Sequence, residues 1–274
     1  MGGPHASEWC RYHPPGVVLA GLRRTSLTQI LRVALKTGDQ NMTDVGTSST
    51  RATIRRGALA AWFIVIAGAI SSTLFGIAAD WNLRPSFQPS DYLTAGHAQV
   101  FRWAAFTDMF SYYLPFLLVV LAVHASSRGV PDDDRRTMAV AGVLYVIVGS
   151  IGAVLLATAG ASLIQAHVDT GDPTTVTMFK ALTDGVFVGL WQILEVVFAA
   201  VWWFGMARTW AESTLLRTLG YVMAGAGIVA AAARMLQLDG LAWVSVLIFV
   251  LLWLPAILFV GLRLRRLSSA GATI

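Results

Sequence analysis

The sequence has very little cysteine and very little charge. The single cysteine, Cys10, excludes an internal disulfide bond and any zinc or iron–sulfur site built from several cysteines. Charged residues make up only 13% of the 274 residues and hydrophobic residues 56%, whereas soluble domains carry about 25% charged residues. A soluble globular domain is therefore excluded, and the composition is that of a membrane protein.

The sequence also lacks the motifs that would indicate catalysis or nucleic-acid binding. The Asp-Thr-Gly triplet at residues 169–171 has neither the preceding apolar strand nor the second carboxylate of an aspartic protease. The histidines His97, His124 and His167 do not pair at the depth that a membrane-bound haem requires. The net charge of +5 comes from arginines beside apolar runs, with no basic stripe. We expect no catalytic residue, cofactor, metal or nucleic-acid partner.

Six apolar runs are long enough to cross a bilayer as helices. Hydrocarbon offers backbone groups no partner outside the segment, and the runs are too long and too evenly apolar for barrel strands. The sequence therefore predicts an all-α, polytopic membrane protein with six transmembrane helices in one bundle. The predicted spans are residues 57–79, 105–125, 138–164, 185–207, 216–236 and 241–262.

The first 41 residues differ from the rest of the chain. Arg23 and Arg24 interrupt the one apolar stretch that could serve as a secretory signal, and Met42 begins a polar, basic lead of the kind that often starts a bacterial membrane protein. We interpret residues 1–41 as disordered or as a mis-assigned extension, with a surface-lying amphipathic helix as the alternative. Residues 42–56 are then a cytoplasmic lead, residues 57–266 the transmembrane domain and residues 267–274 a cytoplasmic tail.

Arginine placement predicts the orientation of the six helices. With both termini in the cytoplasm, eleven arginines of residues 42–274 lie on the cytoplasmic side and four basic residues on the other, as the positive-inside rule prefers. Arginine outnumbers lysine eighteen to two, amid abundant alanine, glycine and valine, which is typical of GC-rich bacterial coding. We expect a bacterial plasma (inner) membrane. The cytoplasmic set is Arg51, Arg55, Arg56, Arg128, Arg135, Arg136, Arg208, Arg217, Arg263, Arg265 and Arg266, against Arg84, Arg102, Lys180 and Arg234.

Glu195 is the most informative residue of the sequence. It lies ~15 Å along the fourth span from Gly185, near the middle of a hydrocarbon layer ~30 Å thick. A carboxyl at that depth costs roughly 2.5–3.5 kcal/mol, so we expect it to face other helices, with Gln192 and Trp202 on the same face. Two interpretations stay open. Glu195 is either a protonated group hydrogen-bonded to Gln192 or Tyr145, or a proton-relay or cation-binding group.

Asp108 and Arg234 form a second set of candidate residues. In the second span Asp108 shares one α-helical face with Ser111, Tyr112 and Pro115, while Arg234 lies near the outer end of the fifth span. The two charges fall at similar depth, and a lone charge there needs a partner. We expect an Asp108–Arg234 ion pair, and the alternative is a gate or solute contact at an outer mouth.

Small residues and prolines predict the packing of the spans. Gly149, Ala153 and Ala157 repeat at four-residue spacing in the third span and permit close helix contact. Pro115 and Pro255 should kink their helices. Between the third and fourth spans, residues 167–184 form an expected external connection in which Asp172 caps a short helix that begins at Pro173.

The C-terminal half has a recognisable rhythm. The segments GVFVGLWQILEVVFAAVWWFGMARTW, LLRTLGYVMAGAGIVAAAARML and LIFVLLWLPAILFVGLRLRR resemble an uncharacterised family of six-pass bacterial integral membrane proteins, classed only as a domain of unknown function. The resemblance covers residues 52–266. The family has no established activity, so the resemblance implies the six-pass fold and no particular chemistry.

Two hypotheses for function follow. The first is a non-enzymatic structural or regulatory bundle in which buried charges only join helices. The second is a small-solute or proton-linked transporter with a site formed by Glu195, Gln192, Asp108, Tyr112 and Arg234. A membrane enzyme ranks third, because no nucleophile and base converge. The lipid bilayer is the expected partner, and self-association stays open.

Overall fold

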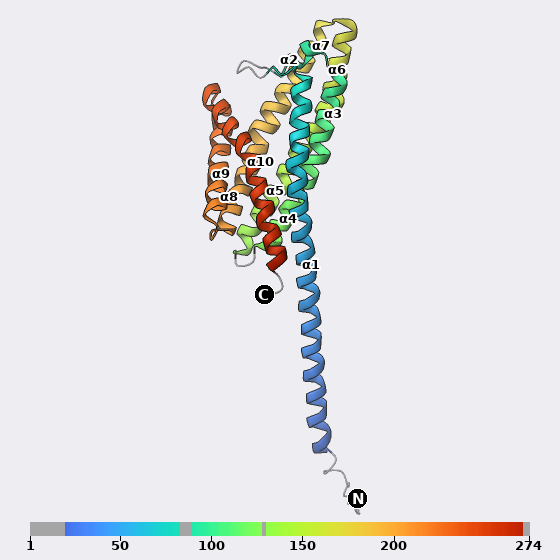
Figure 1. Cartoon of the computed structure of the whole chain (residues 1–274), viewed down its shortest axis with the longest axis vertical. Helices are drawn as coiled ribbons and strands as arrows, with labels where there is room; N and C mark the ends of the chain where they lie inside the picture. Colours follow the sequence, from blue (N-terminus) through green and yellow to red (C-terminus); the bar gives the residue numbers. More distant parts are fainter. Residues whose placement is uncertain (1–19, 83–88, 128–129, 271–274) are drawn as a thin grey trace, which may run out of the picture. The chain divides into compact units, whose positions relative to one another are not determined.

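The computed structural model describes residues 20–82, 89–127 and 130–270, with side chains from residue 48 to residue 269 within these ranges. The chain divides into two units, Met1–Ser49 and Thr50–Ile274. Helix α1 (Ala20–Ala78) supplies residues 20–49 of the first unit and opens the second, which holds every other element (Figure 1). The sequence predicted disorder or an extension up to residue 41, whereas α1 begins at Ala20. Residues 1–19 lie outside the described residues.

The second unit contains six helices long and apolar enough to cross a membrane, and every regular element in the described residues is helical. The predicted all-α, six-span fold is therefore confirmed. All six predicted spans overlap observed ones, although the third and fourth are much longer than expected. The observed spans are Ser48–Ala78, Ala98–Ser126, Asp132–Thr170, Pro173–Thr209, Thr214–Met235 and Asp239–Ser269.

The second, third and fourth spans each contain a π-helical stretch, which the sequence did not predict. The π-helix has i→i+5 hydrogen bonds, is rare, and occurs often at functional sites. A short helix α2 (Asp91–Ala95) precedes the second span. The three spans consist of α3 (Ala98–Asp108), η1 (Met109–Tyr113) and α4 (Leu114–Ser126); α5 (Asp132–Leu155), η2 (Leu156–Gly160) and α6 (Ala161–Thr170); and α7 (Pro173–Thr183), η3 (Asp184–Glu195) and α8 (Val196–Thr209). The fifth and sixth are α9 (Thr214–Met235) and α10 (Asp239–Ala270).

A tight turn joins α6 to α7. Gly171 ends α6 with a left-handed φ of 64°, and Asp172 accepts a hydrogen bond from the Thr174 N–H at 2.8 Å, with Pro173 in the first turn of α7. The predicted cap is confirmed, but residues 167–170 and 173–184 continue the two spans as helix. The Thr174 hydrogen bond holds the pKa of Asp172 below its ordinary value. The capping carboxylate therefore contributes stability above the ordinary Asp pKa, and this is lost as the pH falls through the lowered pKa.

Helix α5 lies at the centre of the bundle, packed against α4, α8, η1 and η3, and α9 packs between α8 and α10 (Figure 1). Outward-facing positions of the spans carry large apolar side chains, such as Ile66, Ile151 and Leu251, which are 63%, 49% and 65% exposed. In water such a surface would drive aggregation, and a bilayer removes that cost. The protein is therefore a multi-pass membrane protein.

Ion pairs join neighbouring spans at the end of the unit where α8 turns into α9. Arg208 of α8 contacts Asp134 of α5 at 3.0 Å, and Arg263 of α10 pairs with Glu212. We call this the termini end, because residues 50 and 269 lie on this side of an even number of crossings. The opposite end, where α6 turns into α7 and α9 into α10, is the hairpin end.

Candidate functional site

A pocket of about 370 Å³ lies inside the six-helix unit. It is lined by residues of α1, α3, η1, α5, η3, α8, α9 and α10, and so by every one of the six spans. Its lining residues on α1 (68–75), α9 (230) and η3 (187–195) fall in the hairpin half of their spans or near the middle. The pocket therefore reaches from the centre of the bundle toward the hairpin end.

Glu195 lines this pocket and is only 7% exposed. It ends η3, and both of its carboxyl oxygens lie 3.0 Å from the Tyr113 hydroxyl, which donates to them. Asp108 and Tyr145 are also close enough to interact with it. The predicted inward orientation of Glu195 is confirmed, but its hydrogen-bond partner is Tyr113, a residue that the sequence did not single out.

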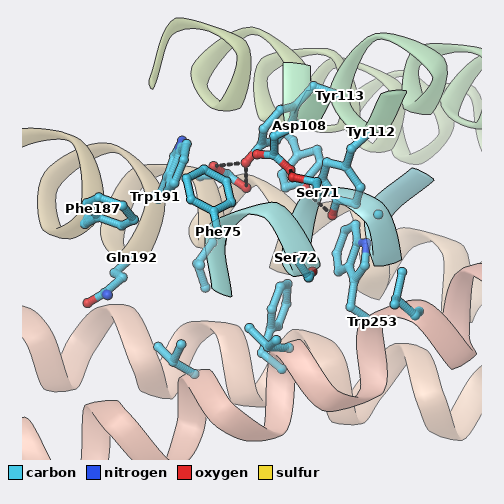
Figure 2. Close-up of a pocket in the computed structure, with 18 of the residues that line it drawn as sticks. Ser71, Ser72, Phe75, Asp108, Tyr112, Tyr113, Phe187, Trp191, Gln192 and Trp253 are labelled. Atoms are coloured by element: carbon cyan, nitrogen blue, oxygen red, sulfur yellow. Dashed lines mark hydrogen bonds between the residues drawn. The ribbon is translucent and has the colours of Figure 1, made fainter. Parts of the chain in front are cut away.

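Asp108 is the second carboxyl of the pocket (Figure 2). Its Oδ1 accepts from the Ser71 hydroxyl of α1 at 3.2 Å, and this hydroxyl also lies 3.3 Å from the Ala104 carbonyl oxygen. Nearby, the hydroxyls of Tyr112 and Tyr145 lie 2.5 Å apart. Hydroxyl groups are thus the polar neighbours of both carboxyls, and no described Arg, Lys or His forms a salt bridge with either one.

The π-helical turn η1 brings Tyr113 into the pocket. In a regular α-helix Asp108 shares its face with Ser111, Tyr112 and Pro115, as the sequence predicted. In the structure Asp108, Tyr112 and Tyr113 line the pocket, whereas Ser111 and Pro115 do not. The i→i+5 register of η1 places position 113 one turn after position 108. Pro115 follows directly and has no N–H to donate to residue 111, which favours this irregular turn.

The second π-helical stretch, η3, forms another wall of the pocket. Four of its residues line the cavity: Phe187, Trp191, Gln192 and Glu195. The Phe187 and Trp191 rings meet edge to face with centroids 5.0 Å apart. In Figure 2 Phe187, Trp191 and Gln192 stand on one side of the pocket and Tyr112 with Trp253 on the other. A wall of twelve π-helical residues is unusual, and it points to the pocket as the functional part of the protein.

Glycines of α5 provide the space that these aromatic rings occupy. A Cβ atom at Gly149 would overlap the Tyr113 ring, and one at Gly152 would overlap the Trp191 indole. The Trp191 Nε1–H donates to the Gly149 carbonyl oxygen at 3.4 Å. The small-residue repeat of the third span therefore does more than bring helices together, because it positions the hydroxyl that bonds to Glu195.

An aromatic cluster separates the pocket from the termini end. The Trp253 ring contacts Tyr112 and Trp203, with centroids 5.8 and 5.5 Å apart, and Phe116 contacts Trp202 at 5.0 Å. Trp202, Trp203 and Phe116 are fully buried or nearly so. These rings close the path toward the termini end, so the pocket has a sealed floor.

Arg234 does not form the expected ion pair with Asp108. Its Nε donates to Oε1 of Gln192 at 2.6 Å and its Nη1 to Oδ1 of Asp239 at 2.8 Å. The prediction was wrong because Asp239, at the start of α10, lies just across the α9–α10 turn and offers a carboxylate that remains hydrated, whereas Asp108 points into the pocket. Arg234 thus holds η3 to the α9–α10 hairpin at the edge of the pocket.

Replacing Arg234 tests this assignment. Arg234→Gln is expected to reduce the free energy of unfolding by about 1–2 kcal/mol, because two charged hydrogen bonds are lost at a site that water partly screens. Combined with Asp108→Asn, the two effects should add to within about 0.5 kcal/mol, since the residues share no contact. Unfolding in detergent micelles measures both, with Arg217→Gln on the same helix as the control. A coupling well above that value between positions 108 and 234 would restore the ion pair.

Four of the five residues proposed from the sequence meet in one place. Glu195, Gln192, Asp108 and Tyr112 line the pocket, and Arg234 contacts it through Gln192. Sequence reasoning missed Ser71, Tyr113, Trp191 and Trp253. Nothing in the α-helical periodicity could have placed Tyr113, since that periodicity is broken at η1.

The histidines lie away from the pocket. His97 pairs with Asp80 at 2.7 Å, and His167 lies 3.0 Å from the Thr175 hydroxyl, both near the hairpin end. Within the described part of the chain, no group of three or more His, Cys, Asp and Glu residues could hold a metal ion.

The chain stands apart in comparisons with known proteins: no protein-family model, curated protein or solved structure matches it. Fold and site alone therefore define its class. It is a six-span membrane protein whose interior holds a pocket lined by two carboxyls, three tyrosine hydroxyls and several aromatic rings.

Proposed function

We propose that the protein is a proton-linked carrier of a small solute, with the pocket as its binding site and Glu195 as the group that gains and loses the proton. One observation carries this proposal: Glu195 and Asp108 share a cavity in the bundle interior, and no described cation forms a salt bridge with either. Ionisable groups inside transmembrane segments are costly, and they commonly mark proton or solute pathways.

The competing interpretation is the structural or regulatory bundle, in which buried charges only join helices. It would be favoured if the carboxyls formed ion pairs between spans or were sealed in packed protein. The nearest such pairing, Arg234 with Asp239, leaves both pocket carboxyls out. The hydrogen bonds of Tyr113 to Glu195 and of Ser71 to Asp108 do join spans. They do not account for a cavity of about 370 Å³ beside them.

Binding of a solute and of a proton would be linked in this pocket. A solute that enters from the hairpin end meets Glu195, whose charge changes when it binds a proton. A ligand that prefers one charge state shifts the protonation equilibrium, and protonation shifts the affinity for the ligand by the same factor. Proton-coupled carriage needs this linkage.

We also propose the orientation. Placing both termini in the cytoplasm satisfies the arginine distribution and directs the hairpin end outward, which makes the described conformation outward-open with its floor closed by the aromatic cluster. A bacterial plasma membrane fits the arginine-rich composition.

Infrared spectroscopy on the protein in lipid nanodiscs tests the proton linkage without any solute. The carbonyl stretch of a protonated carboxyl should appear and disappear as the pH is varied over the range in which the protein stays folded, and this band should be lost in Glu195→Gln. The groups that face Glu195 are Tyr113, Tyr145 and Asp108, so Asp108→Asn separates the second carboxyl from the first.

Asp184 provides the matched control. It is an exposed carboxyl of η3, and Asp184→Asn makes the same acid-to-amide change outside the pocket. The Glu195-dependent band should persist in this variant. A protein in which no titrating band depends on Glu195 would be the structural bundle, and the carrier proposal would fail.

A further inference from the structure

We infer that the solute is a small organic monocation, a compact apolar body that carries one positive charge on nitrogen. This inference rests on the proposed carrier function and names the substrate class of the same pocket. Its first support is the charge of the lining. The nineteen lining residues include two carboxyl groups and no Lys, Arg or His. An anion would enter against that charge, and a neutral solute would leave it unused.

The second support is the abundance of aromatic rings. Eight of the nineteen lining residues are aromatic, whereas aromatic residues make up 11% of the chain. Phe75 and Trp191 stand on one side of Asp108 and Trp253 on the other (Figure 2). Cations that lie over the faces of Trp, Tyr or Phe within about 6 Å are attracted by the ring quadrupole, by about 2 kcal/mol or more when desolvated. Carboxylates together with aromatic faces form the usual recognition site of an alkylated or quaternary ammonium group.

The third support is size and the shortage of oxygen ligands. About 370 Å³ falls at the small end of ligand pockets, which span about 300–1,000 Å³. A metal ion such as Ca²⁺ needs about 6–8 oxygen ligands in one shell, and the described residues hold no acidic or histidine cluster of that kind. Most of the remaining lining is apolar, including Val196, Val246 and Leu254. The pocket therefore suits the hydrocarbon body of an organic cation and not an inorganic ion.

A charge series of fixed shape tests this inference on the full chain in nanodiscs. The probes are choline, its neutral isostere with carbon in place of the quaternary nitrogen, and the tert-butylacetate anion. Phenethylammonium serves as a second cation. Calorimetric titration is expected to give at least about tenfold tighter binding of choline than of the neutral isostere, a difference of about 1.4 kcal/mol. Binding of the anion should not be detected.

The variants locate the binding. Glu195→Gln should weaken choline binding about tenfold or more, whereas Asp184→Asn should leave it unchanged. Choline affinity should also fall as the pH is lowered, because proton and cation compete for the carboxylates that face each other with Tyr113 and Tyr145. The inference is overturned if the neutral isostere binds as tightly as choline, if the anion is preferred, if Glu195→Gln binds choline like the wild type, or if neither cation binds at millimolar concentration. A Glu195-dependent infrared band that persists alongside such a result would leave the proton linkage standing and refute only the substrate class.

Discussion

In proteoliposomes with an acidic interior, the wild-type protein is expected to accumulate choline at least about tenfold faster than Glu195→Gln. The physical reason is competition for one carboxyl. Glu195 holds either a proton or a cation, so a conformational change that carries one across the membrane returns the other, and a proton gradient drives the cation in the opposite direction. The amide cannot be ionised, which removes both the attraction for the cation and the link to the gradient. Radiolabelled choline uptake with and without the gradient gives the rates.

Asp184→Asn is the control for this experiment, because it makes the same chemical change on the same span outside the pocket. Its uptake should match the wild type. Gradient-independent uptake that survives in Glu195→Gln would contradict the role given to Glu195. Choline that binds but is never transported, in any variant, would leave a binding protein in place of a carrier.

Gly149→Ala is expected to disrupt the site from a helix that contributes no charged group to it. The new Cβ would overlap the Tyr113 ring, which is wedged against Tyr145 with ring centroids 5.7 Å apart. Tyr113 must move, and its hydroxyl then leaves both oxygens of Glu195. Overpacking of a core costs about 1–3 kcal/mol, and a buried carboxyl that loses its donor adds a penalty of similar size. Thermal unfolding should show a clear decrease in Tm, with choline affinity reduced about tenfold or more.

Gly225→Ala is the matched control. A Cβ atom at this exposed position of α9 meets no neighbour within 4 Å, so the substitution should be neutral or stabilise the helix by about 0.5–1 kcal/mol. Equal effects of the two alanines would mean that helix propensity alone matters at position 149. Normal stability with normal choline affinity in Gly149→Ala would show that Tyr113 can leave Glu195 without consequence.

These two experiments separate the two roles that buried polar groups can have in this bundle. If Glu195 and Tyr113 only join spans, both substitutions lower stability and no solute or proton effect follows. If they form a transport site, Glu195→Gln affects flux far more than stability, because an amide of the same shape still accepts the Tyr113 hydrogen bond. The contrast between flux and Tm therefore decides between the bundle and the carrier.

How far the sequence reached can be followed at the charged residues. It placed Glu195 inside the bundle and brought Asp108 and Tyr112 to the same region, because an ionisable group in a bilayer has few places to go. It failed at Arg234, since the nearest hydrated carboxylate, Asp239, became its neighbour only through the α9–α10 turn. It also ended the third and fourth spans too early, because threonines and charges near the α6–α7 turn do not look like a membrane span.

The sequence by itself determined the number of crossings, the all-helical fold and the burial of a carboxyl in the fourth span. Those features follow from one local cost, that of exposing backbone and charge to hydrocarbon, and composition is enough to evaluate it. Only the tertiary structure decided which side chains meet. The π-helical turns shift the register by one residue, the α5 glycines admit the rings of Tyr113 and Trp191, and a pocket forms where those rings stand apart. Contacts of this kind depend on small differences in packing between distant segments, which no local pattern in the sequence encodes.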